Sequence, residues 1–181
     1  MNDWYREYQL LNNGIETVAK ITKVSSVGVR DPVEIENVAF EFAYHDSIIN
    51  GYTVAETNNK YALTPDGMPL SVNDEFTVKL VKGKPEIYEL DFSKPSLKTI
   101  EHYIDITSKT LINLKIFTAG EKQKSQCICL SQNIFLKYGT DGLAMVLFND
   151  EFMTENFSHN AVTFKKFIGK KEVKELIERC K

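Results

Sequence analysis

The sequence predicts an α+β protein in which a small five-stranded β-barrel of the SH3 or OB kind, residues 1–96, precedes a helical domain, residues 97–181. Two observations support this division. Before Ser96, short segments alternate apolar and polar residues, as half-buried strands do. After Ser96, apolar residues recur every three or four positions, the period of an amphipathic helix. A small sheet hides its edges best by closing on itself, so we expect a barrel.

The first two strands carry the clearest period-two pattern. One face of the segment "GIETVAKITKVSS" contains Ile15, Thr17, Ala19 and Ile21. In "EIENVAFEFAYHD" the apolar face contains Val38, Phe40, Phe42 and Tyr44. Side chains of a strand point alternately to its two faces, so these two sets belong to the barrel interior.

Turn residues divide the rest of the first half. Asn50-Gly51 predicts a type I′ turn, because both residues tolerate positive φ, and "YTVAET" is then the returning strand. The sequence from Thr64 to Gly67 predicts a second turn. The last two strands are joined at Lys82-Gly83-Lys84-Pro85, and this hairpin is expected to close the barrel. Their apolar positions are Phe76, Val78, Leu80, Ile87, Leu90 and Phe92.

Four or five short amphipathic helices are predicted after Ser96, a residue that can cap the first of them. Its apolar stripe consists of Leu97, Ile100, Ile104 and Leu111. Residues 110–118 also alternate, so a strand is the alternative there, and the helix is preferred. The next helix ends at Gly139, and another begins at Asp141. The helix that ends at Gly139 has the apolar residues Cys127, Leu130, Ile134 and Tyr138, and the helix that begins at Asp141 has Leu143, Val146 and Leu147. Two later helices follow. The first has the apolar residues Phe157, Ala161, Phe164 and Ile168, and the second has Val173, Leu176, Ile177 and Cys180.

Composition indicates a folded protein without a membrane span. The 181 residues are 43% hydrophobic and 26% charged, which is close to the globular norm. No apolar run approaches the roughly 18 residues of a transmembrane helix, and the N-terminus lacks the pattern of a signal peptide. The three cysteines have no framework spacing, which favours a reducing compartment. We therefore expect a cytoplasmic protein.

The order of these strands resembles a bacterial family of unknown function whose members carry a small β-barrel beside transmembrane helices. The resemblance covers residues 14–92 and rests on the segments "GIETVAKI", "VAFEFAY", "GYTV" and "VNDEFTVKLVKGKPEIYEL". This chain departs from the family because it has no apolar segment that spans a membrane. The resemblance implies a fold, and it carries no functional residue across.

No catalytic, cofactor-binding or metal-binding constellation is predicted. Cys127 and Cys129 would point about 200° apart on a helix, so buried, inert thiols are favoured over metal ligands. The candidate histidines are His45, beside Asp46 at a hairpin tip, His102, near Asp105, and His159. A surface or capping role is favoured for His159, because no nucleophile or acid accompanies it. For His45 and Asp46 a turn is favoured over an acid-base pair, because neighbouring side chains of a strand point to opposite faces, and for His102 and Asp105 a solvated pair is favoured. The glycines form no phosphate-binding loop.

The predicted function is that of a non-catalytic module that binds a protein or peptide through the barrel. Residues 1–96 carry 9 Lys or Arg against 15 Asp or Glu, a net charge of −6 that disfavours nucleic acid. The predicted contact residues are Tyr44, His45, Tyr52 and Tyr61, although rings that close the barrel core are an alternative for the tyrosines. The alternative function is a hydrolase-like enzyme whose site assembles only in the fold. The sequence predicts neither the partner nor the oligomeric state.

Overall fold

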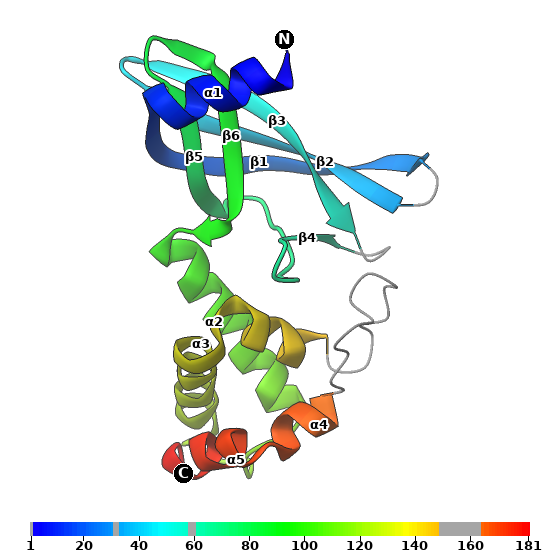
Figure 1. The fold of residues 1–181 in the computed structure, drawn as a ribbon. Helices are drawn as coiled ribbons and strands as arrows, with labels where there is room; N and C mark the ends of the chain where they lie inside the picture. The colour runs from blue at the N-terminus through cyan, green and yellow to red at the C-terminus, as the bar shows by residue number, and fades with distance from the viewer. Residues whose placement is uncertain (1, 31–32, 58–60, 149–163) are drawn as a thin grey trace. The chain divides into compact units, whose positions relative to one another are not determined.

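A computed structural model describes residues 2–30, 33–57, 61–148 and 164–181 (Figure 1). The chain separates into two compact units. The first consists of Met1–Pro65 and Pro69–Thr99, and the second of Asp66–Met68 and Ile100–Lys181. The change of unit lies inside a helix, just after the predicted boundary at Ser96.

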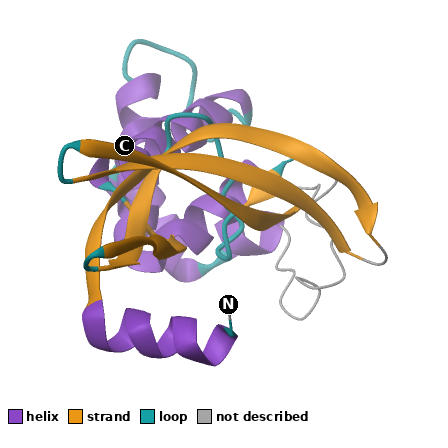
Figure 2. Cartoon of the chain, turned by 90° about the horizontal axis from the view of Figure 1, so that it is seen from above, coloured by secondary structure: helices purple, strands orange, loops and turns teal. Residues whose placement is uncertain are grey.

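The first unit contains an antiparallel sheet with six strands among the described residues. The strands are β1 (Gly14–Arg30), β2 (Val33–Tyr44), β3 (Ser47–Thr57), β4 (Ala62–Leu63), β5 (Glu75–Val81) and β6 (Lys84–Pro95). Their order is β4-β3-β2-β1-β5-β6. Figure 2 shows the strands arching rather than lying flat, so the sheet forms a curled half-barrel. The predicted α+β class is confirmed, whereas the description as five strands omitted the two-residue β4.

The long strand β1 connects the two sides of the half-barrel. Residues from Gly14 to Lys20 pair with β5, and residues from Ala19 onward pair with β2. The register with β2 shifts between Ile21 and Lys23, an irregularity of the kind that bends a strand. At this bend Ile21 exchanges backbone hydrogen bonds with Asn73 and Asp74, 2.9 and 2.8 Å long, just before β5 begins. These two hydrogen bonds therefore join the bend in β1 to the residues just before β5.

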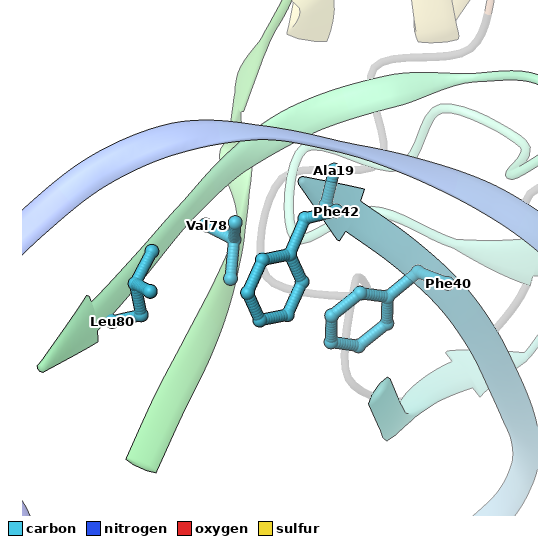
Figure 3. Packing of buried hydrophobic residues seen from close by; sticks show 5 residues of the cluster. All are labelled: Ala19, Phe40, Phe42, Val78 and Leu80. Carbon is cyan, nitrogen blue, oxygen red and sulfur yellow. The ribbon is translucent and has the colours of Figure 1, made fainter. Parts of the chain in front are cut away.

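The inner face of the curled sheet holds an apolar core (Figure 3). Its central buried residues are Ala19, Phe40, Phe42, Val78 and Leu80, and partly buried residues packed against them are Tyr44, Ile49, Tyr88 and Leu90. The alternation predicted for β2 and β5 is confirmed, because every inward residue of β5 is buried. In β1 the prediction holds for Ala19 and Ile21, whereas Ile15 is exposed.

A helix that the sequence interpretation missed precedes the sheet. α1 (Asp3–Asn13) begins at Asn2, whose side-chain oxygen accepts a hydrogen bond from the Trp4 amide at 3.2 Å. Its one buried residue, Leu10, packs with Val81 and Ile87 of the β5–β6 hairpin. Only one residue of this helix is buried, so α1 makes a small contact with the sheet.

The predicted turn at Asn50-Gly51 is wrong. Tyr44 pairs with Ser47, so the turn between β2 and β3 lies at His45-Asp46, and His45 has a φ of 51°. Gly51 lies inside β3, directly opposite Phe40. A Cβ atom on Gly51 would lie 2.4 Å from the Phe40 Cζ atom. The glycine is required by the close approach of this ring rather than by a turn.

We predict that Gly51→Ala lowers the free energy of unfolding by about 1–3 kcal/mol, the usual cost of overpacking a core. The Phe40 ring is buried against Phe42 and Tyr88, so it cannot move aside freely. Urea denaturation measures the change. Asn50→Ala, at the exposed neighbouring position, is the control and should change stability by less than about 0.5 kcal/mol. Equal effects of the two substitutions would contradict the close packing of the Phe40 ring on Gly51.

The sheet ends at Pro95 and a helix begins at once, as predicted. Ser96 Oγ accepts a hydrogen bond from the Thr99 amide at 3.3 Å, which confirms the predicted cap. The buried Thr99 hydroxyl in turn accepts the Glu75 amide at 2.6 Å and donates to the Glu75 carbonyl at 3.0 Å. The first turn of the helix is thereby tied to the start of β5.

The stripe predicted for this helix, α2 (Leu97–Asn113), is wrong in part. Leu97 is 80% exposed, while the fully buried residues are Thr99, Tyr103, Thr107, Ser108 and Leu111. Hydroxyl groups can be buried here because some of them bond the helix backbone, as Ser108 Oγ does with the Asp105 carbonyl at 2.8 Å. The helix continues to Asn113 and is followed by a turn, so the described residues 110–118 contain no strand.

The second unit contains the remaining helices, α3 (Gln123–Leu147), α4 (Phe164–Gly169) and α5 (Lys171–Arg179). Gly139 interrupts α3 with a φ of 65°, which agrees with the predicted stop and restart. The face predicted for the first part is buried at Cys127, Leu130 and Ile134. Phe157 and Ala161, predicted to belong to a helix, lie outside the described residues. Among the described helices, none combines the length and the apolar character needed to cross a membrane.

Candidate functional site

The tips of two hairpins meet at one end of the half-barrel. The β5–β6 turn lies at Lys82-Gly83, as predicted, with Gly83 at a φ of 79°. The Gly83 amide donates a hydrogen bond to the Tyr44 hydroxyl at 2.7 Å. Tyr44 stands at the end of β2, so its phenol joins strands that are not neighbours in the sheet.

Tyr88 makes a second connection across the open side of the sheet. Its ring packs edge-on against Phe40 and Phe42, with centroid distances of 5.5 and 5.7 Å. Its hydroxyl accepts the Tyr52 amide of β3 at 3.2 Å, and its carbonyl accepts Arg6 Nη2 of α1 at 2.6 Å. Tyr44 and Tyr88 thus act as structural links, and their hydroxyls are already engaged with backbone amides.

The outer face of β3 carries large apolar side chains in contact with solvent. Tyr52 is 70% exposed, Ile48 61% and Val54 53%, and we name these three residues the β3 outer patch. They share a face because they are separated by even numbers of residues in an unbroken register with β2. Opposite them on β2 lie the small residues Ala43 and Ala39, and Asn37. The side chains of β2 that lie opposite the patch are therefore small.

Charged side chains lie beside the β3 outer patch on the same face. Glu41 of β2 forms an ion pair with Lys20 of β1, 2.8 Å long, and this pair raises the pKa of Lys20 through its hydrogen bond and Coulomb attraction. Glu56 of β3 follows Val54 on the same face and is exposed. The three side chains of the patch are therefore apolar, with a carboxylate beside Val54.

The structure brings together some of the predicted contact residues and separates others. His45 is exposed at the hairpin tip, and its ring lies 4.3 Å from the Tyr44 ring. Tyr52 lies on the same hairpin. Tyr61 precedes β4, which pairs with Glu56 and Thr57 at the far end of β3, so it does not join the hairpin tip.

Aromatic residues of α1 were not predicted as contact residues. Trp4 and Tyr8 stack at 5.6 Å and both are exposed. Tyr5 accepts a hydrogen bond from Lys84 Nζ at 3.2 Å, beside the β5–β6 turn. Trp4, Tyr8 and the exposed Leu11 are spaced as residues on one face of a helix. This spacing is the sequence signal for the exposed aromatic face of α1.

The described histidines belong to different units. His45 lies in the first unit and His102 in the second, and His159 lies outside the described residues. Within the part of the chain that the structure describes, no group of three or more His, Cys, Asp or Glu side chains is arranged to hold a metal ion.

The expectation of a buried, inert thiol is wrong for Cys129. Cys129 of α3 and Cys180, just after α5, form a disulfide with a Cα–Cα distance of 5.8 Å. They are 51 positions apart in the sequence, and only the return of α5 to α3 brings them together. Cys127 is free and buried, and this burial raises the pKa of its thiol. Because two of the three cysteines are paired, the cysteines no longer support a reducing compartment, and a cytoplasmic location stays a prediction.

Comparison of the chain with family models, with curated proteins and with solved structures gives no match. The resemblance of residues 14–92 to a bacterial family thus stays a prediction. Function has to be argued from the surface itself.

We predict that Tyr44→Ala and Tyr52→Ala have different effects on stability. Tyr44 is half-buried against the core and its hydroxyl is bonded, so its loss should lower the melting temperature by roughly 2–4 °C for each kcal/mol removed from a chain of this length. Tyr52 projects into solvent, and its removal should leave the melting temperature nearly unchanged. Differential scanning calorimetry makes the comparison. A large loss for Tyr52→Ala would assign that ring to the core.

Proposed function

We propose that this chain is a non-catalytic module that binds a protein or peptide through the β3 outer patch. The observation that carries the proposal is the exposure of Tyr52 together with Ile48 and Val54 on one face of a single strand. A single apolar residue on a surface is ordinary, whereas here three large apolar side chains lie on one face of one strand, with Asn50 between Ile48 and Tyr52.

Tyr52 is the expected anchor of this interface. A tyrosine ring contributes a large contact area with two rotatable side-chain bonds, and tyrosine is enriched among the residues that dominate binding energy. Its backbone is fixed by β2 on one side and by the Tyr88 hydroxyl on the other. The ring is therefore presented from a rigid position, which reduces the entropy lost on binding.

The proposed module belongs to the SH3 or OB kind of barrel. Its support is the curled antiparallel sheet and the arrangement of β3, which among the described residues pairs with β4 only at Glu56 and Thr57. Such folds bind extended peptides through aromatic surfaces and strand edges. An apolar patch with the carboxylate of Glu56 beside it favours a peptide segment over nucleic acid, whose phosphates require clustered cations.

The experiment is a quantitative capture of partners from the native host by the full chain. We predict that Tyr52→Ala reduces capture of a specific partner by at least about tenfold, which corresponds to about 1.4 kcal/mol. The control is Leu136→Ala, which removes an equally exposed apolar side chain from α3. It should leave capture unchanged.

Two outcomes would contradict the proposal. One is a partner that Tyr52→Ala captures as well as the unmodified chain does. The other is equal loss for both variants, which would indicate nonspecific adhesion to exposed apolar groups. Circular dichroism of each variant confirms that the fold is retained.

A further inference from the structure

The C-terminal helix α5 is attached to α3 by a covalent bond and by few other contacts. Cys180 follows the last residue of α5, and its disulfide to Cys129 closes the second unit at this end. The Lys181 carbonyl also accepts a hydrogen bond from Gln126 Nε2 of α3 at 3.2 Å. The disulfide is therefore the strongest connection between the end of the chain and α3.

The noncovalent anchoring of α5 is small. Within its nine residues only Val173 and Leu176 are buried, and the opposite face is charged and exposed. Helices shorter than about 12 residues are marginal in water without tertiary support. The retention of α5 as a packed helix consequently depends on its attachment at Cys180.

The surroundings of the disulfide suit thiol exchange. Asn133 Nδ2 lies 3.5 Å from Cys129 Sγ and 3.6 Å from Cys180 Sγ. A hydrogen-bond donor placed between both sulfurs stabilises whichever thiolate leaves when the bond is attacked, and a better leaving group speeds exchange. Cys129 is only half-buried, so an attacking thiolate can approach it.

The third cysteine does not compete in this chemistry. Cys127 is fully buried, and its raised pKa keeps it as a thiol rather than as the nucleophilic thiolate. It lies on the helical face opposite to Cys129, because two residues along a helix correspond to about 200°. Exchange is thereby confined to the Cys129–Cys180 pair.

We propose that the Cys129–Cys180 disulfide is a reversible redox latch that holds α5 against α3. A thiolate of a dithiol reductant attacks one sulfur, forms a mixed disulfide and releases the other cysteine as a thiolate, which takes up a proton. The second thiol of the reductant then loses its proton, attacks the mixed disulfide and releases the remaining cysteine. The protein gains two thiols, and the dithiol leaves as a disulfide. Without the cross-link, α5 separates from α3.

Hydrogen exchange of the full chain, followed by mass spectrometry, tests the latch with dithiothreitol as the dithiol. We expect amides of α5 to exchange at least about tenfold faster after reduction, because loss of the closed loop favours local opening. Amides of β1 and β5 serve as the internal reference and should not change. Reoxidation should restore the slow exchange of α5.

Matched variants separate the latch from general damage. Cys180→Ser should exchange rapidly at α5 with or without dithiothreitol, whereas Cys127→Ser should respond as the unmodified chain does. Thiol counting under denaturing conditions should give one free thiol before reduction and three after it. Three free thiols in the untreated protein would overturn the proposal. So would unchanged protection of α5 once three thiols are present.

Discussion

Tyr88 lies across the interior of the curled sheet, and its edge-on packing against Phe40 and Phe42 joins β6 to β2, strands that share no backbone ladder. This contact explains two further features of the first unit. Gly51 has to be small because the Phe40 ring occupies the space above it. The hydroxyl of Tyr88 reaches the Tyr52 amide, so the packed ring also fixes the strand that carries the exposed patch. One set of aromatic rings fills the core, while the Tyr52 ring is exposed on the outer face.

The strands could be predicted from the sequence because their periodicity directly reflects burial. Phe40 and Phe42 alternate with polar or small residues, and both are buried on the inner face. The start of α2 was also predictable, since Ser96 caps it through a local hydrogen bond. Such features depend on residues close together in the sequence, where propensity and geometry act jointly.

Features set by distant residues could not be obtained in this way. Asn50-Gly51 is a strong local turn signal, yet the register with β2 and the Phe40 ring place both residues inside a strand. The disulfide joins cysteines 51 positions apart, and spacing alone does not reveal such pairs. Tyr44 and Tyr52 differ because the register of β2 and β3 places Tyr44 on the inner face and Tyr52 on the outer face. Tertiary contacts decided each of these cases.

A double-mutant cycle between Phe40 and Tyr88 tests this account most directly. The free energy of unfolding would be measured by urea denaturation for Phe40→Leu, for Tyr88→Leu and for the double variant. Direct ring packing predicts a coupling energy of about 0.5–1.5 kcal/mol, so the double variant should lose less stability than the two single losses combined. Losses that add within about 0.3 kcal/mol would mean that the rings do not hold β6 to β2.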